Sequence, residues 1–114
     1  MREGAVILIP LPQADGVTKN RPALVLRQLP KFGDWLVCGL STQLAQYVPG
    51  FDELLDPKNS DYKASGVMQP SVVRLGFLAV VPQTRVLGTI GVVSPERHAR
   101  LLHNLASHLV LGRR

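Results

Sequence analysis

The chain has 114 residues, of which 46% are hydrophobic and 18% charged, and its formal net charge is +5 at pH 7. This length allows one hydrophobic core, and the apolar content excludes a disordered chain. No apolar run reaches the about 18 residues that a membrane-spanning helix needs, so no membrane association is expected. The positive charge favours an anionic partner, either a nucleic acid or an acidic protein.

Two features bear on the cellular compartment. The apolar stretch at residues 5–9 is followed at once by Pro10 and Pro12 and lacks a small-residue cleavage site. We therefore expect a first strand there and not a signal peptide. Cys38 is the single cysteine and lies in an apolar segment, which predicts a buried structural thiol and a cytoplasmic location.

Apolar and β-branched runs predict a series of strands. They cover residues 4–9, 22–27, 34–40 and 71–81, and at least one more short strand is expected within residues 84–93. Gly76 interrupts the fourth strand, which indicates a bulge or a close backbone approach.

The segment between residues 43 and 66 shows neither helical nor strand periodicity, apart from a short apolar pair at Leu54 and Leu55. This predicts a long functional or mobile loop, and we expect a flap over a substrate groove. The segment also holds half of the acids in the chain, which we interpret as a solvated face: Asp52, Glu53, Asp56 and Asp61.

A helix start is predicted at Ser94, where a hydroxyl N-cap precedes Pro95 and the acidic Glu96. The helix is expected to reach about residue 110 and to stop at Gly112. Its apolar stripe consists of Leu101, Leu102, Leu105 and Leu109. The predicted fold is mainly β, a small curled barrel of antiparallel strands with a C-terminal helix, and it forms one domain over residues 1–114.

Several kinds of chemistry lack support in the sequence. His98, His103 and His108 lie five residues apart on the predicted helix, so successive rings point about 140° apart and cannot converge on one metal ion. No serine lies in a nucleophile-elbow motif, and no glycine-rich phosphate loop is present. No metal or cofactor is expected.

Polar side chains on the strands remain as candidates. Arg21 is held by Pro22 at the start of a predicted strand, where its guanidinium can fork onto a phosphate or form a surface salt bridge. Arg74 lies in mid-strand among apolar neighbours, so it must be paired or face a polar cleft. Ser41, Thr42 and Gln43 follow the third strand, where hydroxyls either donate to a phosphate or start a turn.

Four blocks and the terminal helix resemble the MazF/PemK family of toxins: Arg-Pro-Ala-Leu-Val-Leu at residues 21–26, Leu-Ser-Thr-Gln at 40–43, Pro-Ser-Val-Val-Arg-Leu at 70–75 and Ile-Gly-Val-Val-Ser-Pro-Glu at 90–96. The resemblance covers nearly the whole chain. It implies an SH3-like β-barrel, usually a homodimer, that acts as the endoribonuclease of a type II toxin–antitoxin pair. It also implies metal-independent, sequence-selective cleavage of single-stranded RNA, and an antitoxin partner with an acidic tail.

The implied reaction is attack by a ribose 2′-hydroxyl on the adjacent phosphate. By motif match, the catalytic residues are Arg21, Thr42 and Arg74; the two arginines supply the cations, and one of them is a candidate proton donor. Thr42 orients the phosphate or the ribose. Five further residues are expected to bind the substrate: Lys19, Asn20, Ser41, Gln43 and Gln69.

The chain departs from the family pattern at one position. Several family members carry an aspartate two residues after the strand arginine as a candidate base, and this chain has Gly76 there. Either another base such as Asp15 serves, or cleavage is slow, or it is lost. Two other readings stay open: a non-catalytic barrel that binds RNA or a protein target such as gyrase, and a structural barrel without a ligand.

Overall fold

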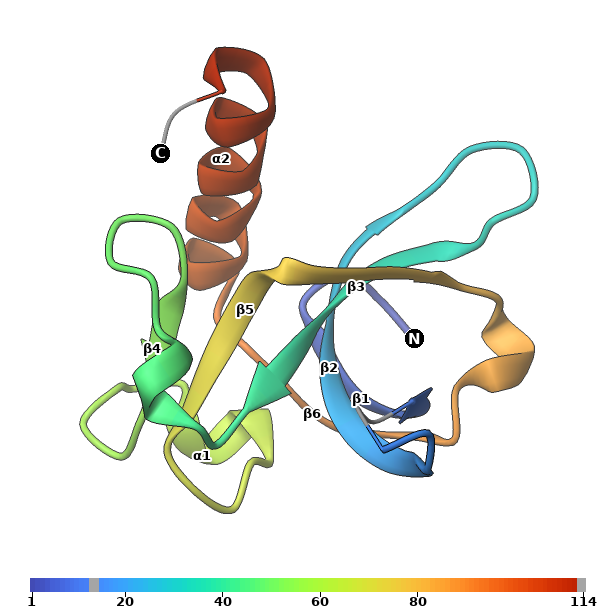
Figure 1. The fold of residues 1–114 in the computed structure, drawn as a ribbon, viewed down its shortest axis with the longest axis horizontal. Coiled ribbons are helices and arrows are strands. Elements are labelled where there is room, and N and C mark those ends of the chain that lie inside the picture. The colour runs from blue at the N-terminus through green and yellow to red at the C-terminus, as the bar shows by residue number, and fades with distance from the viewer. Residues whose placement is uncertain (13–14, 113–114) are drawn as a thin grey trace.

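The computed structural model describes residues 1–12 and 15–112, and it is mainly β, as the sequence predicts (Figure 1). All its strand pairs are antiparallel and form one curled sheet in the order β4-β5-β3-β2-β1-β6. The strands are β1 (Ala5–Pro12), β2 (Thr18–Gln28), β3 (Trp35–Ser41), β4 (Glu53–Leu55), β5 (Ser71–Val81) and β6 (Gly88–Val92). The helices are α1 (Tyr62–Ser65) and α2 (Pro95–Leu111), with single 3-10 turns at Leu44–Gln46 and Gln83–Arg85.

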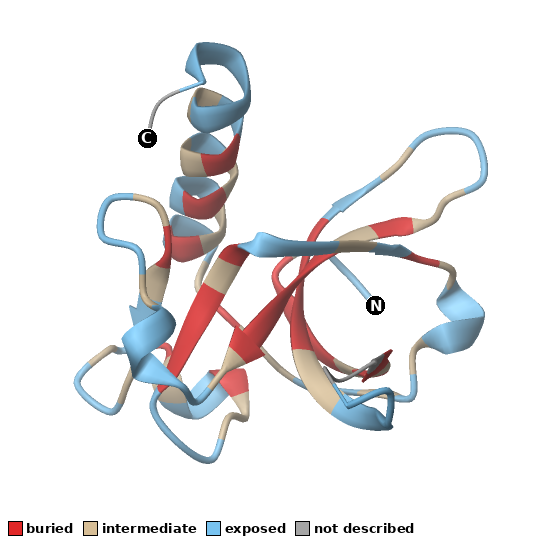
Figure 2. Ribbon diagram, in the orientation of Figure 1, coloured by how far each residue is buried: buried red, intermediate tan, exposed pale blue. Residues whose placement is uncertain are grey.

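The central strands are buried on both faces, which explains why they read as continuous apolar runs. Figure 2 shows much of these strands as buried. Alternate residues of β1, β2 and β3 belong to two separate cores. One core includes Leu24 and Cys38 and continues into Leu101 and Leu105 of α2. The other includes Val25 and lies on the opposite face of the sheet.

The first two strands are longer than the sequence predicts. β1 continues through Pro10 and Pro12, and β2 begins at Thr18, before Pro22. The pairing of β1 with β6 ends at Leu8, so Pro10 and Pro12 lie beyond this ladder, in which a proline would lose a hydrogen bond. Pro22 in β2 has the same protection, since β3 pairs with β2 only from Ala23 onward.

The bulge predicted at Gly76 is present in β5. Cys38 pairs with Leu78 but Gly39 pairs with Arg74, so residues 75–77 form an insertion relative to β3. The strand changes character here: residues 71–75 are mostly buried, whereas residues 76–80 are mostly exposed. The bulge therefore separates a core half of β5 from a surface half.

Residues 51–65 contain β4 and α1 and hold all four acids buried or half-buried, so the prediction of a solvated acidic face is wrong. Residues 43–50 are mostly exposed and contain only the 3-10 turn Leu44–Gln46, as the prediction of an irregular segment requires. Asp52 and Asp61 are buried at 5% and 8% exposure. Arg97 of α2 donates to both oxygens of Asp61, at 2.8 and 3.1 Å, to Glu53 at 2.9 Å and to the carbonyl of Leu54 at 3.0 Å. These contacts fix the segment to the helix across more than 35 residues of sequence.

The C-terminal helix begins and ends where the sequence predicts. The Ser94 hydroxyl accepts from the backbone N–H of Arg97, and Gly112 closes the helix in the left-handed conformation. Leu101 and Leu105 are buried, but the last member of the predicted stripe, Leu109, is 69% exposed. Among the described residues, no helix has the length and apolar character needed to cross a membrane.

Candidate functional site

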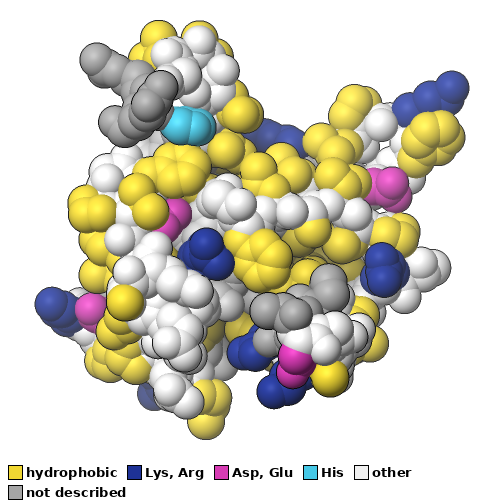
Figure 3. All heavy atoms as spheres, viewed as in Figure 1, with side chains coloured by type: hydrophobic (Ala, Val, Ile, Leu, Met, Phe, Trp, Pro, Cys, Tyr) yellow, Lys and Arg dark blue, Asp and Glu magenta, His cyan; other side chains and the backbone are white. Residues whose placement is uncertain are grey.

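A polar pocket of about 210 Å³ lies where β2, the end of β3 and the β5 bulge meet. Five residues that the sequence singles out are brought together here, although 53 positions separate the first from the last. The pocket is lined by Arg21, Leu40, Ser41, Thr42, Gln43, Gln46, Arg74 and Phe77. Figure 3 shows several Lys and Arg side chains around the middle of the face of the molecule that is turned to the viewer.

Strand register places the two arginines. Arg21 pairs with Ile9 on β1, just before the point where β3 joins β2 at the pair Ala23 and Gly39. Gly39 in turn pairs with Arg74 on its other side. Both arginines are half-buried, and both line the pocket. Arg74 thus faces a polar cleft, one of the two environments that its sequence context requires.

The two hydroxyls after β3 have different surroundings. The Ser41 hydroxyl accepts a hydrogen bond of 3.0 Å from the backbone N–H of Gln43, so it starts the turn that ends the strand. Its O–H proton can still be donated outward. Thr42 is exposed at the pocket, where its hydroxyl can donate to an anion.

Phe77 completes the pocket and is not among the residues that the sequence predicts for the site. The guanidinium carbon of Arg74 lies 5.7 Å from the centre of the Phe77 ring, within range of a cation–π contact. The ring also lies against Gly39, where an added Cβ would be 2.5 Å from a ring carbon. Its position directly after Gly76, where the sequence predicts a bulge, is the sequence feature that could have identified Phe77.

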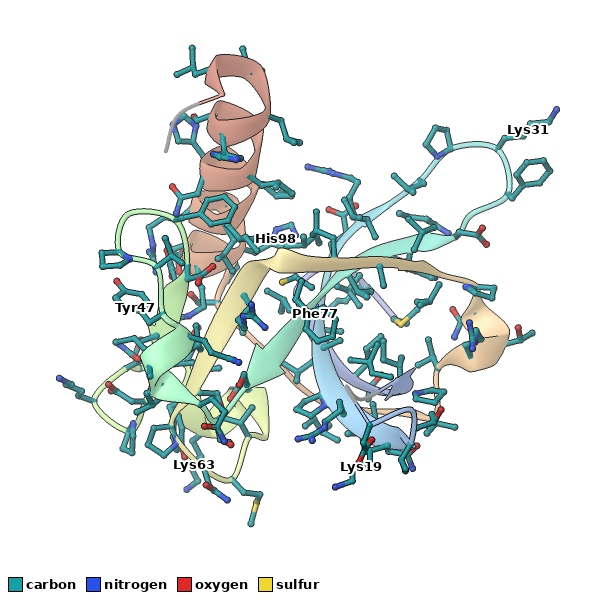
Figure 4. All side chains as sticks on the ribbon, viewed as in Figure 1. Lys19, Lys31, Tyr47, Lys63, Phe77 and His98 are labelled. Atoms are coloured by element: carbon teal, nitrogen blue, oxygen red, sulfur yellow. The ribbon has the colours of Figure 1, made fainter. Side chains whose placement is uncertain are left out.

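Four sequence candidates lie elsewhere. Lys19 and Asn20 are exposed residues of β2 that do not line the pocket, and Lys19 lies near the tip of the β1–β2 hairpin (Figure 4). Gln69 is exposed outside the pocket, and its carbonyl accepts from the Ser71 hydroxyl. Asp15 accepts from the N–H of Val17 in the hairpin turn and does not line the pocket either.

Within the part of the chain that the structure describes, the lining of this pocket contains no carboxylate and no histidine. Asp52 lies behind the bulge: its two oxygens accept from the backbone N–H groups of Leu75 and Val48, each at 3.0 Å. Burial, reinforced by the charge of Asp52, raises the pKa of the Cys38 thiol to about 12. Cys38 is therefore a core residue and not a nucleophile.

Other hollows and ionisable groups are less suited to chemistry. A hollow of about 490 Å³ beside the start of α2 includes Asp61, but that carboxylate is paired with Arg97. His98 lines the same hollow, and its Nε2 lies 2.7 Å from the carbonyl of Leu26. Among the described residues, no three His, Cys, Asp or Glu side chains lie close enough to hold a metal ion.

Comparison with known proteins places this geometry in a family. The family model described as "PemK-like, MazF-like toxin of type II toxin-antitoxin system" matches residues 2–109. The solved structure of the Mycobacterium tuberculosis toxin MazF-mt6 is similar, with a TM-score of 0.68 and 19% sequence identity over 93% of this chain and 96% of that one. No curated protein sequence matches this chain. The match over residues 2–109 shows that the chain belongs to the PemK-like, MazF-like toxins of type II toxin–antitoxin systems.

Proposed function

We propose that residues 1–114 form one toxin domain that acts as a sequence-selective endoribonuclease on single-stranded RNA in the cytoplasm. The observation that carries the proposal is the convergence of Arg21, Thr42 and Arg74 on one polar pocket. Two permanently charged guanidiniums and a hydroxyl can hold a phosphodiester by charge-assisted hydrogen bonds. Membership of the family supports the same assignment.

In the proposed reaction, the ribose 2′-oxygen attacks the adjacent phosphorus and the bond to the 5′-oxygen of the next nucleotide breaks. The products are a 2′,3′-cyclic phosphate and a 5′-hydroxyl. Negative charge grows on the phosphate oxygens as the bonds change, and Arg21 and Arg74 stabilise it from fixed positions on the sheet. This charge stabilisation uses side chains of the protein and does not require a metal ion.

Two proton transfers must accompany this reaction. Arg74 is the candidate donor to the leaving 5′-oxygen, and Thr42 orients the phosphate or the ribose. The described lining of the pocket supplies no carboxylate or histidine that could accept the 2′-proton as a general base. General-base catalysis typically contributes about 100-fold to 10,000-fold, so we expect slow cleavage.

The same observation favours one alternative function. A pocket with two arginines and no base binds RNA as well as a nuclease does, but it leaves the strand intact. A toxin of this kind blocks the RNA, or a protein target such as gyrase, by occupancy alone. Where the target is RNA, the two proposals differ in the fate of the RNA and not in its binding.

Two partners belong to the proposal. The net charge of +5 and the arginines of the pocket suit an antitoxin with an acidic tail. A second copy of the chain is the other partner, and the exposed last turn of α2, Leu109 to Leu111, is a candidate contact. The edge of β1 is not available for the contact along residues 5–8, because β2 and β6 pair with β1 there. Light scattering should give about twice the monomer mass of 12.4 kDa.

One experiment tests the activity. Purified protein is incubated with a mixed single-stranded RNA, and the product ends are mapped for 2′,3′-cyclic phosphate and 5′-hydroxyl groups. Cleavage at a restricted set of sequences that is lost in Arg74→Ala supports the nuclease. Retained RNA binding without cleavage over a long incubation favours the alternative, and failure to bind or cut RNA contradicts both RNA proposals.

A further inference from the structure

The aromatic side chain at the pocket is held in an unusual place for a large apolar group. Phe77 is 37% exposed and lies on the surface half of β5, directly after the glycine of the bulge. In Figure 4 it lies at the centre of the view, where β3 and β5 approach each other. Neither hydrophobic core includes it.

Two other residues fix the position of the ring. Gly39 leaves room for it, since a Cβ at that position would lie 2.5 and 3.0 Å from two ring carbons. Arg74 lies over it at 5.7 Å. The ring is thus placed beside the guanidinium that our proposed function assigns to the phosphate, with part of its surface open to solvent.

We propose that Phe77 is the stacking platform for an unpaired nucleobase of the RNA, next to the phosphate held by Arg21 and Arg74. This inference rests on the proposed RNA-binding function. Single-stranded nucleic acids are commonly held by basic grooves combined with aromatic rings, because every base presents a π-face. A phosphate bound at Arg74 brings its own nucleoside into the neighbourhood of the ring.

Different residues of the pocket would contact the face and the edge of this base. The ring of Phe77 has no hydrogen-bonding group, so it holds a base by its face and discriminates little between bases. The side-chain amides of Gln43 and Gln46 line the same pocket and carry both donors and acceptors for a base edge. Affinity at this position therefore comes from Phe77, and base preference from the glutamines.

The chain offers a matched control. Phe32 is 82% exposed, and the ammonium of Lys31 lies 5.5 Å from its ring centre, so it is also an aromatic ring beside a cation. It lies in the β2–β3 connection and does not line the pocket. A non-specific gain from exposed aromatic surface would affect Phe32 and Phe77 alike.

The test compares two probes. One is a labelled pool of short single-stranded RNA of random sequence with fluorine in place of each 2′-hydroxyl, which prevents cleavage. The other is a strand of equal length with the sugar–phosphate backbone and no bases. Dissociation constants are measured for the parent, Phe77→Leu, Phe77→Trp and Phe32→Leu. A second variant, Gly39→Ala, displaces the ring without changing Phe77.

Phe77→Leu should weaken binding of the base-bearing pool about 5-fold to 100-fold and leave the abasic strand unchanged. Gly39→Ala should act in the same direction, while Phe77→Trp and Phe32→Leu keep the affinity of the parent. Equal binding of the pool by Phe77→Leu and the parent overturns the stacking role alone. Equal weakening of both probes also overturns it, since Phe77 then only orders the pocket. A parent that binds neither probe and cuts no RNA overturns the proposed function together with the inference.

Discussion

The carboxylate of Asp52 accepts a hydrogen bond of 3.0 Å from the backbone N–H of Leu75, the residue immediately after Arg74. Its second oxygen accepts from the N–H of Val48, so one buried side chain joins the 48–52 turn to the β5 bulge. Arg74 directly precedes the bulge and Phe77 lies within it, and both line the pocket. Asp52 therefore positions the pocket from behind without lining it.

We predict that Asp52→Asn lowers both stability and turnover. An asparagine has one acceptor oxygen, so either Leu75 or Val48 loses its partner, at a cost of about 1–3 kcal/mol in unfolding free energy. A small shift of the bulge moves Arg74, and misplacement of about 1 Å can reduce turnover roughly 100-fold. Urea unfolding and single-turnover RNA cleavage measure the two effects.

Asp56→Asn is the matched control, because the Asp56 carboxylate accepts from the N–H of Lys58 and lies 4.0 Å from the Lys58 ammonium, in a turn that does not line the pocket. It should leave both quantities nearly unchanged. If Asp52→Asn loses stability but cleaves RNA at the rate of the parent, the hydrogen bond to Leu75 supports the fold and does not position Arg74.

The ion pair between Asp61 and Arg97 predicts how stability depends on pH. Burial by itself raises the pKa of the Asp61 carboxyl, but hydrogen bonds from Arg97 and Ser94 and the charge of Arg97 outweigh burial and hold this pKa below its usual 3.8. A carboxyl whose folded pKa is lowered stabilises the fold at higher pH. This contribution is complete above the unfolded pKa, near pH 4, and is lost as the pH falls through the folded pKa.

We therefore expect Asp61→Asn to unfold at lower urea concentration than the parent at pH 6, by up to about 3 kcal/mol since Glu53 still pairs with Arg97. The gap should narrow at pH 3. Glu96→Gln, an exposed acid in the first turn of α2, serves as the control. A gap of the same size at both pH values would mean that the charge of Asp61 does not provide the stabilisation.

Local patterns were sufficient for much of the fold. Residues 71–81 contain enough β-branched side chains to predict β5 with both its ends, and the Ser-Pro-Glu start and Gly112 bound α2. The segment between β3 and β5 could not be predicted in this way. Two of its acids, Glu53 and Asp61, are paired with Arg97, which lies more than 35 residues later in the chain. A partner so distant leaves no periodic pattern within the segment.

The candidate site was predictable for a different reason. Arg21, Thr42 and Arg74 stand out as polar residues on or after apolar strands, and the family resemblance adds their roles. The register of β2, β3 and β5 brings them together. Phe77 and Asp52 follow from neither. Their proximity to Arg74 depends on three inserted residues in β5, and a lone glycine predicts a bulge without fixing which side chains it turns outward.

Arg74 should matter more for turnover than for folding. Removing a fixed donor to transition-state charge typically reduces the rate about 100-fold to 1,000-fold. Loss of a partly exposed strand arginine changes unfolding free energy by about 0.5 kcal/mol or less. We expect Arg74→Ala to remove RNA cleavage and growth arrest with an unchanged circular dichroism spectrum, and Arg74→Lys to recover little, because a point charge does not replace a guanidinium fork.

The control for this prediction is Arg27→Ala. Arg27 lies on β2 like Arg21, but its side chain is 54% exposed and pairs with Glu3 at 3.1 Å. It carries the same charge and does not line the pocket. Equal cleavage by Arg74→Ala and the parent would make Arg74 structural, and equal losses in both variants would point to net charge alone.

Gly76 allows the missing base to be supplied. A Cβ at this position would meet no atom of the described residues within 4 Å, and Gly76 is not among the glycines with positive φ, so the backbone accepts an ordinary side chain. Gly76→Asp places a carboxylate two residues after Arg74, as in the family members that carry an aspartate there. General-base catalysis is typically worth about 100-fold to 10,000-fold. We expect the cleavage rate to rise by an amount in this range, with little change in RNA affinity.

Gly76→Asn, which has the same shape and no basic oxygen, should leave the rate unchanged. If both variants cut at the parent rate in single-turnover assays, the 2′-proton has another acceptor, and Gly76 is not the reason for slow cleavage.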